Sequence, residues 1–465
     1  MNRMKKALSV LLALVMLTSA VSVSAFAVSG DINYTISNPY SEVNWDEWSQ
    51  YKADLHCHTT ASDGTTDFAD MVEIHYQQDF DFLAITDHGT ICRSWTDVNY
   101  IPVLQKAIGI SNGTLADPTP LTVARYNEII TGADRDGRGM LQVPFTMEQN
   151  PTSLNNAHVN SFFADYGDGV IRGTSNYEEV IAGVEAAGGL SVINHPGEYT
   201  SAKKAASDAE AYNEDYAYYI DKFENLLLTY PSCLGIDINS KDDGRTKYDR
   251  KLWDIMLADL IPNGRSVYAI ATSDAHKESV VGAGWTVFPL PEQTIEAFRA
   301  AMESGTFFAC SRSIKNATEL SEWAAETGRT FENEWRADSS APPVAVTSIT
   351  VDDDADTITV NTVNAESVHW IANGEVICVG NTIDLDDYSD EIGSYVRAEA
   401  WGEGSILYTQ AFTLDYVSSP TAGINTDFFD FGNLIADLRG IASEVLSMFE
   451  HFNILWELLT GVQPG

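Results

Sequence analysis

Two histidines and two aspartates lie within the eleven residues 54–64, DLHCHTTASDG. If residues 53–58 form a strand, its side chains alternate between two faces, so Asp54, His56 and His58 share one face. Mixed imidazole and carboxylate groups are the ligands that metals such as Zn²⁺, Mn²⁺ and Fe²⁺ favour. A His-x-His spacing also occurs at polar strand ends without a metal, so this stretch alone leaves both interpretations open.

Further candidate ligands follow other short apolar runs. The runs FDFLAITDH, LQVPFTME, LSVINHP and SVYAIATSDAH end at or beside His88, Glu148, His195, Asp274 and His276. Six of the nine histidines belong to these motifs or lie close to them: His56, His58, His88, His158, His195 and His276. The other three, His75, His369 and His451, lie inside expected helices or strands, and we interpret them as ordinary surface or core residues.

The apolar runs alternate with helical stretches between about residues 54 and 311, for example residues 67–78, 177–187 and 248–260. Regular alternation of strand and helix predicts parallel strands joined by crossovers, and therefore an α/β sheet or barrel. In barrel enzymes the active site lies at the carboxyl ends of the strands. The polar residues that follow each run are therefore expected to meet in one place.

The motifs resemble those of the PHP family, the polymerase and histidinol phosphatase metallohydrolases, and in particular its TrpH-like and CehA-type exported members. The residues that carry the resemblance are DLHCHTTASDG, AITDHG, FTME with His158 ten residues later, INHPG, GIDIN and ATSDAH. Downstream, GAGWTVF and AMESGTFFACS also resemble the CehA-type branch. The resemblance covers roughly residues 50–312.

The resemblance implies a distorted (β/α)₇ TIM-like barrel that holds divalent metal ions, three in number, with Mn²⁺, Fe²⁺ and Zn²⁺ all open. Carried over by motif, it implies one metal on His56, His58, Glu148 and Asp274, a second on Glu148, His158 and His195, and a third on Asp63, His88 and His276. Glu148 would bridge the first two metals. Metals in such a site activate water and neutralise a phosphoryl group. The predicted catalytic residues are Glu148, His195 and Asp274, with Asp87 and Arg93 beside them.

A phosphorylated substrate also needs Arg or Lys side chains near the metals. The candidates, each following a strand-end motif, are Arg93, Lys241, Arg245, Lys247 and Lys277, of which Arg93 and Arg245 are favoured. A solvated surface position is the alternative for each of them. Asp54 is expected either to orient a ligand or to form an ordinary strand-end hydrogen bond, and Asp237 in GIDIN is expected to be structural.

Four segments are predicted along the chain. Residues 1–27 have the basic start, apolar run and small residues of a secretory signal peptide, so we expect a secreted or cell-surface protein. Residues 31–335 are predicted to form the metallohydrolase domain, and the period-two pattern of residues 343–417 predicts a small Ig-like β-sandwich. Residues 425–465 are predicted to form an amphipathic helix with a mostly acidic polar face. Such a helix favours docking on protein over binding a membrane surface.

The composition restricts the partners. A formal net charge of −40 argues against attraction to duplex nucleic acid or anionic lipid. A phosphorylated substrate therefore requires local cations, which bound metals could supply. No segment after the signal peptide is apolar enough to span a membrane. The five cysteines are few and widely spaced, so we expect no disulfide framework and interpret most of them as buried apolar residues.

The function expected from these observations is a secreted, metal-dependent phosphoesterase that acts on small phosphorylated molecules, nucleotides or oligonucleotide ends. Two alternatives stay open. A carboxyl-ester or carbamate hydrolase of the CehA type would use the same metal-bound hydroxide on a carbonyl group. A non-enzymatic surface protein would instead bind a partner such as a glycan through the β-sandwich.

Overall fold

The computed structural model describes residues 32–102, 113, 116–149, 158–169 and 176–416. The predicted signal peptide, residues 1–27, and the predicted C-terminal helix, residues 425–465, lie outside this part of the chain. Residues from Asn33 onward belong to one compact unit. The boundaries proposed above for a metallohydrolase domain and a β-sandwich domain stay a prediction.

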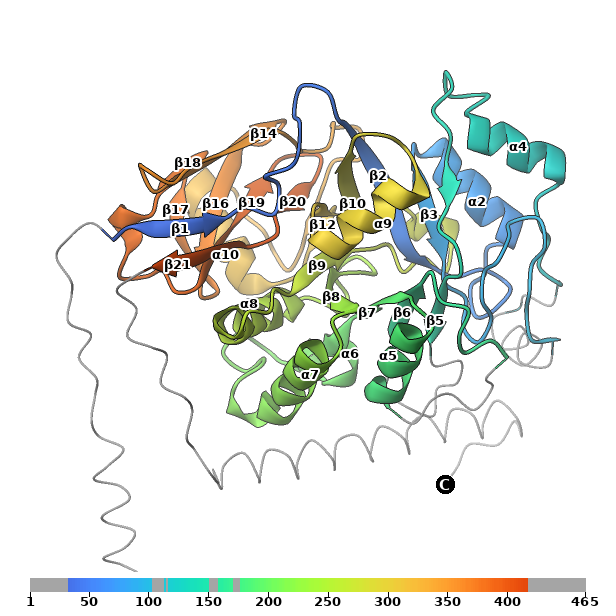
Figure 1. The fold of residues 1–465 in the computed structure, drawn as a ribbon, viewed down its shortest axis with the longest axis horizontal. Helices are drawn as coiled ribbons and strands as arrows, with labels where there is room; N and C mark the ends of the chain where they lie inside the picture. The colour runs from blue at the N-terminus through green and yellow to red at the C-terminus, as the bar shows by residue number, and fades with distance from the viewer. Residues whose placement is uncertain (1–31, 103–112, 114–115, 150–157, 170–175, 417–465) are drawn as a thin grey trace, which may run out of the picture. The chain divides into compact units, whose positions relative to one another are not determined.

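Strands and helices alternate through the first part of this unit (Figure 1). The strands are β2 (Ser49–Cys57), β3 (Phe82–Ile85), β4 (Leu141–Gln142), β5 (Met147–Gln149), β6 (Val159–Phe162), β7 (Leu190–Ile193), β8 (Cys233–Asn239), β9 (Tyr268–Ala271), β10 (Gly284–Leu290) and β11 (Phe308–Ser311). The main helices are α2 (Phe68–Gln77), α4 (Val123–Thr131), α5 (Tyr177–Ala186), α7 (Ala217–Thr229), α8 (Asp249–Leu260), α9 (Ile295–Ser304) and α10 (Ala317–Thr327). The expected helices at residues 67–78, 177–187 and 248–260 are thus confirmed as α2, α5 and α8.

The closed (β/α)₇ barrel is not found among the described strands. They form two separate sheets here, one containing β10-β2-β3-β4 and the other with the order β5-β6-β7-β8-β9. Strands β5, β6 and β7 pair antiparallel, and β10 pairs antiparallel with β2, so the parallel alternation is interrupted twice. Two single bridges, His88 with Glu148 and Cys57 with Ala275, link the sheets at the strand ends.

Apolar side chains from both sheets fill the space between them. Buried residues of this core include Ala53 and Leu55 of β2, Val192 of β7 and Ile270 of β9. Since neighbouring residues of a strand point to opposite faces, Asp54 points the other way, toward α2. There its Oδ2 lies 3.1 Å from Nε2 of the buried His75.

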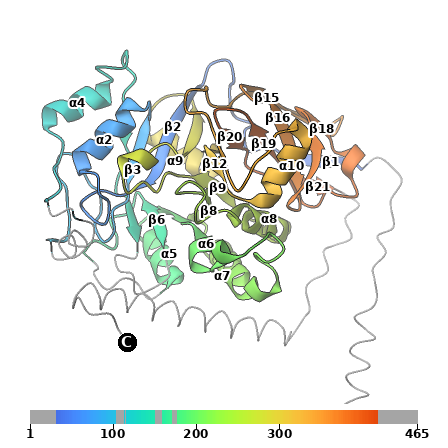
Figure 2. The ribbon, with the colours of Figure 1, turned by 180° about the vertical axis from the view of Figure 1, so that it is seen from behind.

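Residues 345–416 form further strands, as the period-two pattern predicts, with one short 3₁₀ helix, Asp386–Tyr388, among them. They are β14 (Ala345–Asp352), β15 (Thr357–Val363), β16 (Ser367–Ala372), β17 (Glu375–Val379), β18 (Thr382–Asp384), β19 (Tyr395–Trp401), β20 (Ile406–Tyr408) and β21 (Phe412–Tyr416). Strands β14, β15 and β18 make one sheet, whereas β20 pairs with β11 and β21 pairs with the N-terminal strand β1 (Tyr34–Ser37). Figure 2 shows α10 over these strands, and Trp323 of α10 packs on Trp401 of β19. One sheet therefore continues from the first part of the chain into the second.

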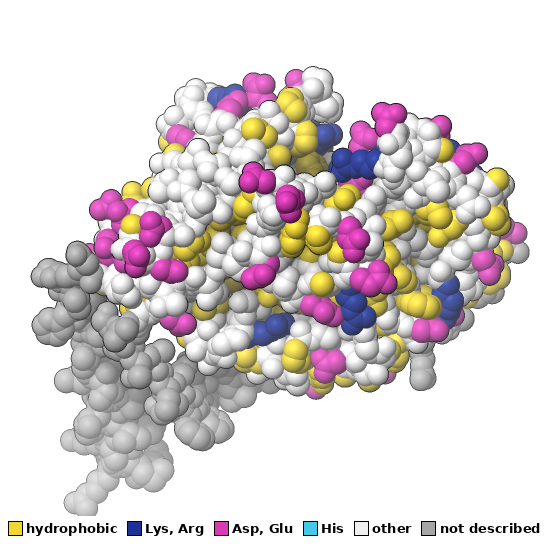
Figure 3. Space-filling model, turned by 45° about the horizontal axis from the view of Figure 1, so that its top comes forward, with side chains coloured by type: hydrophobic (Ala, Val, Ile, Leu, Met, Phe, Trp, Pro, Cys, Tyr) yellow, Lys and Arg dark blue, Asp and Glu magenta, His cyan; other side chains and the backbone are white. Residues whose placement is uncertain are grey.

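The surface and the cysteines agree with the composition. Figure 3 shows acidic side chains spread over the visible face, with Lys and Arg side chains in smaller groups. All five cysteines are unpaired and four of them are buried, as expected. None of the described helices is both long and apolar enough to cross a membrane.

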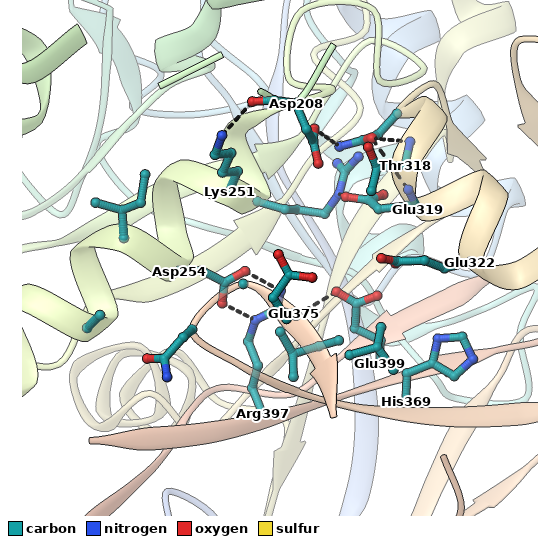
Figure 4. Close-up of a pocket in the computed structure, with 18 of the residues that line it drawn as sticks. Asp208, Lys251, Asp254, Thr318, Glu319, Glu322, His369, Glu375, Arg397 and Glu399 are labelled. Carbon is teal, nitrogen blue, oxygen red and sulfur yellow. Dashed lines mark hydrogen bonds and ion pairs between the residues drawn. The ribbon is translucent and has the colours of Figure 1, made fainter. Parts of the chain in front are cut away.

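A buried arginine joins the C-terminal strands to α8. The Arg397 guanidinium donates from Nε and Nη2 to the two carboxylate oxygens of Asp254, both at 2.7 Å, and from Nη1 to Glu399 at 2.6 Å. Figure 4 shows this cluster beside a cavity of about 620 Å³ that is also lined by Glu319 and Glu322. The junction between α8, α10 and β19 is therefore rich in carboxylates.

This junction predicts a pH-dependent stability. Burial, followed by the nearby Glu399, Glu375 and Asp208, raises the pKa of Glu322 to about 7. The folded state therefore keeps a proton that the unfolded chain releases at lower pH, so the free energy of unfolding falls as the pH rises from about 4.5 to about 7. Glu322→Gln removes this loss. Because the side chain is partly exposed, we expect a gain of about 1 kcal/mol at pH 8 and almost none at pH 4.

Urea unfolding of Glu322→Gln and of the wild type at pH 4 and pH 8 measures this effect. The exposed Glu303→Gln is the matched control, and it should leave the difference between the two pH values as in the wild type. An equal stability change for Glu322→Gln at both pH values would contradict the expectation.

Candidate metal centre

Four predicted ligands bring their donor atoms to one point. Nε2 of His56 lies 3.0 Å from Nε2 of His58, and Oε2 of Glu148 lies 3.3 and 3.2 Å from these two nitrogens. Oδ1 of Asp274 lies 3.5 and 3.4 Å from the same nitrogens. A tetrahedral metal with ligands at about 2.1 Å holds its donor atoms about 3.4 Å apart. The spacing therefore suits a divalent ion better than direct hydrogen bonds, because two imidazoles and two carboxylates otherwise crowd together.

Glu148 presents its second oxygen to another set of side chains. Its Oε1 lies 2.8 Å from Nδ1 of His158 and 3.4 Å from Nε2 of His195, and it accepts a hydrogen bond of 2.8 Å from Asn194. Oε2, on the first side, also lies 3.3 Å from Nε2 of His88. The two oxygens thus face different groups of imidazoles, which is the arrangement that a bridging carboxylate requires.

Asp63 lies beside a third group of side chains, which differs from the group that the resemblance implies. Its Oδ2 lies 3.0 Å from Nε2 of His276 but 3.9 Å from Nε2 of His88, while its Oδ1 lies 3.4 Å from Nδ1 of His58. The compact groups found here are His58 with Asp63 and His276, and His58 with His88 and Glu148. His88 therefore lies nearer to Glu148 than to Asp63. All nine predicted ligands lie in one cluster, but their division among ions stays a prediction.

Irregular backbone places these side chains. The pairing of β2 with β3 shifts register between Asp54 and Cys57, and such a bulge changes the direction of the side chains that follow. His195 and Asp274 have positive φ values of 28° and 42°, which non-glycine residues rarely adopt. Strained residues of this kind concentrate at functional sites.

Two buried aspartates hold the segments that carry the ligands. Oδ1 of Asp54 accepts from the backbone N–H groups of His56 and Ser273, both at 3.2 Å, so it ties the end of β2 to the segment after β9. Asp87 accepts from the backbone N–H and hydroxyl of Thr59 and from the hydroxyl of Ser62. Both oxygens of Asp87 are therefore engaged in fixing the loop before Asp63. These hydrogen bonds suit a positioning role for Asp87, and its catalytic role stays a prediction.

The favoured substrate cation Arg93 forms no ion pair with the nine ligands in the part of the chain that the structure describes. Its guanidinium pairs with Asp168 at 2.9 Å and with Asp165 at 2.5 Å. Lys241 and Arg245 do approach the cluster, since Nζ of Lys241 lies 3.2 Å and Nη1 of Arg245 lies 3.9 Å from Oδ2 of Asp274. The substrate role of Arg93 stays a prediction, and its acidic partners could not be foreseen from a motif because they lie more than 70 residues away along the chain.

Charge and burial set the protonation of the cluster. Burial alone would raise the pKa of Glu148, but His158, His56 and His88 outweigh it and hold the pKa well below its ordinary value. Burial lowers the pKa of His88 to about 3 and that of His195 to about 4. For His58, burial is outweighed by Asp63, Asp274 and Glu148, which raise its pKa well above the ordinary value. Ionised carboxylates and neutral imidazoles are the forms that bind metal, so Glu148, His88 and His195 are in these forms near pH 7, whereas His58 must release its proton when a metal binds.

Several buried polar atoms of the cluster have no hydrogen-bond partner. Both carboxylate oxygens of Asp274 and Nδ1 of His56, His88 and His195 are in this state. Lys241 lies 3.2 Å from Oδ2 of Asp274 and offsets part of its charge, but a buried carboxylate without hydrogen bonds is costly unless further cations compensate it. The donor set and these unpaired oxygens together fit divalent ions.

Sequence reasoning did not single out three residues that support the cluster. Besides Asn194, these are Tyr199, whose hydroxyl lies 2.7 Å from Nε2 of His158, and Glu198, which pairs with Arg245 and with Lys203 at 3.0 Å. All three flank His195 in the stretch INHPGEYT. Their proximity to a motif was the available signal, but the motif alone does not assign a role to the residues beside it.

Comparison with known proteins agrees with the motifs. A family model described as PHP-associated matches residues 263–307, which supports the PHP superfamily. No curated protein matches the chain.

Solved structures similar to this chain include a two-domain protein of Bacteroides vulgatus containing a predicted PHP-like metal-dependent phosphoesterase (12% identity, 84% of this chain and 91% of that one, TM-score 0.38). PsfC of Pseudomonas syringae is 16% identical over 54% of this chain and 88% of that one, with a TM-score of 0.31. The lesion-specific endonuclease EndoQ of Pyrococcus furiosus is 13% identical over 55% of this chain and 56% of that one, with a TM-score of 0.30.

Proposed function

We propose that this protein is a secreted, metal-dependent hydrolase of phosphate esters, related to the TrpH-like and CehA-type PHP proteins. The observation that carries the proposal is the convergence of His56, His58, Glu148 and Asp274 on one point, with three carboxylates and six imidazoles in the whole cluster. The same cluster would hold up to three divalent ions. Export is supported by the N-terminal pattern of residues 1–27.

The chain's own residues have separate tasks in such a reaction. Bound divalent ions supply an activated hydroxide and neutralise the phosphoryl oxygens. Lys241 and Arg245 lie at the edge of the cluster, where their N–H groups can bind the remaining oxygens of the substrate. Asn194 and Tyr199 orient Glu148 and His158 through hydrogen bonds. The substrates proposed are small phosphorylated molecules, nucleotides or oligonucleotide ends.

A carboxyl-ester or carbamate hydrolase is the second candidate. It is favoured by the partial neutralisation of both cations, because Lys241 pairs with Asp274 and Arg245 pairs with Glu198. A carbonyl substrate needs no cation beyond the metals. The glycan contact predicted for the C-terminal strands is independent of both candidates.

One substitution separates the two candidates. Lys241→Met should lower kcat/KM for a phosphomonoester about tenfold or more, since it removes a charge-assisted hydrogen bond of about 1.5–3 kcal/mol. It should change arylester hydrolysis much less. The exposed Lys204→Met is the matched control and should change neither rate.

The assay uses the mature chain loaded with Mn²⁺, with metal content measured by mass spectrometry and substrates drawn from nucleotides, sugar phosphates and arylesters. Release of phosphate from at least one substrate is the expected result. Faster arylester turnover, unaffected by Lys241→Met, would favour the second candidate. Inactivity on every substrate with metal bound would contradict both.

A further inference from the structure

A second cavity, of about 610 Å³, lies between the start of β2 and the segment that follows His276. Its charged lining residues are Lys52, Arg312, Arg336 and Asp242, and its remaining lining includes Gln78 and residues 279–283. The volume falls in the usual range of small-molecule sites, about 300–1,000 Å³. Lys52 precedes His56 by four residues, about 13 Å along β2, so this cavity is separate from the metal cluster.

Arg312 enters this cavity without a carboxylate partner among the residues that the structure describes. Its guanidinium carbon lies 5.4 Å from the centre of the Trp285 ring, and its buried Nε has no hydrogen-bond partner. Burial lowers the pKa of Arg312, and no acidic group offsets that effect. A guanidinium offers five N–H donors in a planar fork that suits an oxyanion. Its environment thus lacks the anion that such a group ordinarily meets.

Lys52 adds a second cation to the same wall. Its Nζ donates to the carbonyl of Gln78 at 3.0 Å, which leaves two of its three N–H donors. Nζ also lies 5.3 Å from the centre of the Trp285 ring, the ring that Arg312 covers. Burial and then the repulsion from Arg312 lower the pKa of Lys52 to about 8, against the opposing effect of Asp54, Asp79 and Asp81.

The remaining two charged groups of the lining largely neutralise each other. Nη1 of Arg336 donates to Oδ1 of Asp242 at 2.8 Å. Lys52 and Arg312 therefore give the cavity an excess of positive charge, in a chain with a net charge of −40. Two neighbouring cations repel each other unless an anion lies between them.

We propose that this cavity binds a small phosphorylated molecule through its phosphate group, with Arg312 and Lys52 as the ligands of the phosphate oxygens. A phosphomonoester carries a charge of about −1.5 to −2 near pH 7, which matches two cations better than a single carboxylate does. The rest of the molecule occupies the remaining volume, beside residues 279–283. This site goes beyond the proposed hydrolase function, because it requires no metal.

Calorimetric titration of the metal-free mature chain with inorganic phosphate, ribose 5-phosphate and acetate tests the site. Arg312→Gln and Lys52→Met should each weaken phosphate binding about tenfold or more, since each removes a charge-assisted hydrogen bond. The control Arg299→Gln, at an exposed arginine that pairs with Glu303, should bind as the wild type does. Lys241→Met, which removes a cation beside the metal cluster, should leave this binding unchanged. Ribose 5-phosphate should bind at least as tightly as phosphate, and acetate more weakly.

Unchanged phosphate affinity in both Arg312→Gln and Lys52→Met would overturn the proposal, as would the absence of phosphate binding by the wild type. Loss of binding in Lys241→Met alone would assign the phosphate to the metal cluster instead. If Arg312→Gln does not fold, a wild-type crystal soaked in phosphate decides the question. Electron density for an anion beside the Arg312 guanidinium is expected there, and an empty cavity would reject the site.

Discussion

Glu148→Gln is expected to lower kcat for the preferred substrate by about a thousandfold, which corresponds to about 4 kcal/mol of lost transition-state stabilisation. The reason is the position of its two oxygens. Oε2 lies within 3.3 Å of His56, His58 and His88, and Oε1 faces His158 and His195. A neutral amide presents only one oxygen and no negative charge, so the substitution affects two ion positions at once.

The measurement pairs steady-state kinetics with metal content by mass spectrometry. The variant should retain fewer bound ions than the wild type. Glu303→Gln is the matched control, because this side chain is about half exposed and, among the described residues, forms an ion pair with the exposed Arg299 alone. His75→Gln is unsuitable as a control, because His75 is fully buried and contacts Asp54. Wild-type activity in Glu148→Gln would show that Glu148 does not bridge the ions.

Arg397→Met is expected to lower the free energy of unfolding by about 3–5 kcal/mol, the usual cost of removing one partner of a buried ion pair. Arg397 is 2% exposed, and the substitution leaves Asp254 and Glu399, which are 5% and 6% exposed, without their cation. Methionine keeps most of the packing volume against Trp253, over whose ring the guanidinium lies. The decrease in the free energy of unfolding therefore measures the cost of leaving the carboxylates of Asp254 and Glu399 without a cation.

Urea unfolding at pH 7 measures this loss. Arg299→Met, which removes the exposed Arg299–Glu303 pair, should cost less than about 1 kcal/mol. The substitution lies at the junction with α8. Folded Arg397→Met, at low urea concentration, should therefore still bind as many metal ions as the wild type. A cost for Arg397→Met no larger than that of the control would mean that water or another group compensates Asp254 and Glu399.

Much of the local structure followed from the sequence, because periodicity reports which residues share a face. The alternation of residues 53–58 correctly placed Leu55 in the core and His56 and His58 together. The helices α2, α5 and α8 could equally be predicted from the sequence, since each has an apolar stripe of helical period. The resemblance of the motifs to the PHP family also pointed to all nine side chains of the cluster, because residue types and spacing are properties of short segments.

Contacts between distant segments needed the tertiary structure. Asp63 and His276 are separated by 213 residues, and only the folded chain shows that His276 rather than His88 lies closest to Asp63. Three other features also depend on contacts between distant segments. They are the arrangement of the strands in two sheets, the approach of Lys241 to Asp274, and the position of Lys52 and Arg312 beside the same Trp285 ring. A sequence pattern fixes the direction of a side chain relative to its own strand or helix, whereas its partner depends on how the elements pack. For this protein, the sequence determined which groups could perform the chemistry, and the packing of the two sheets determined which of them meet.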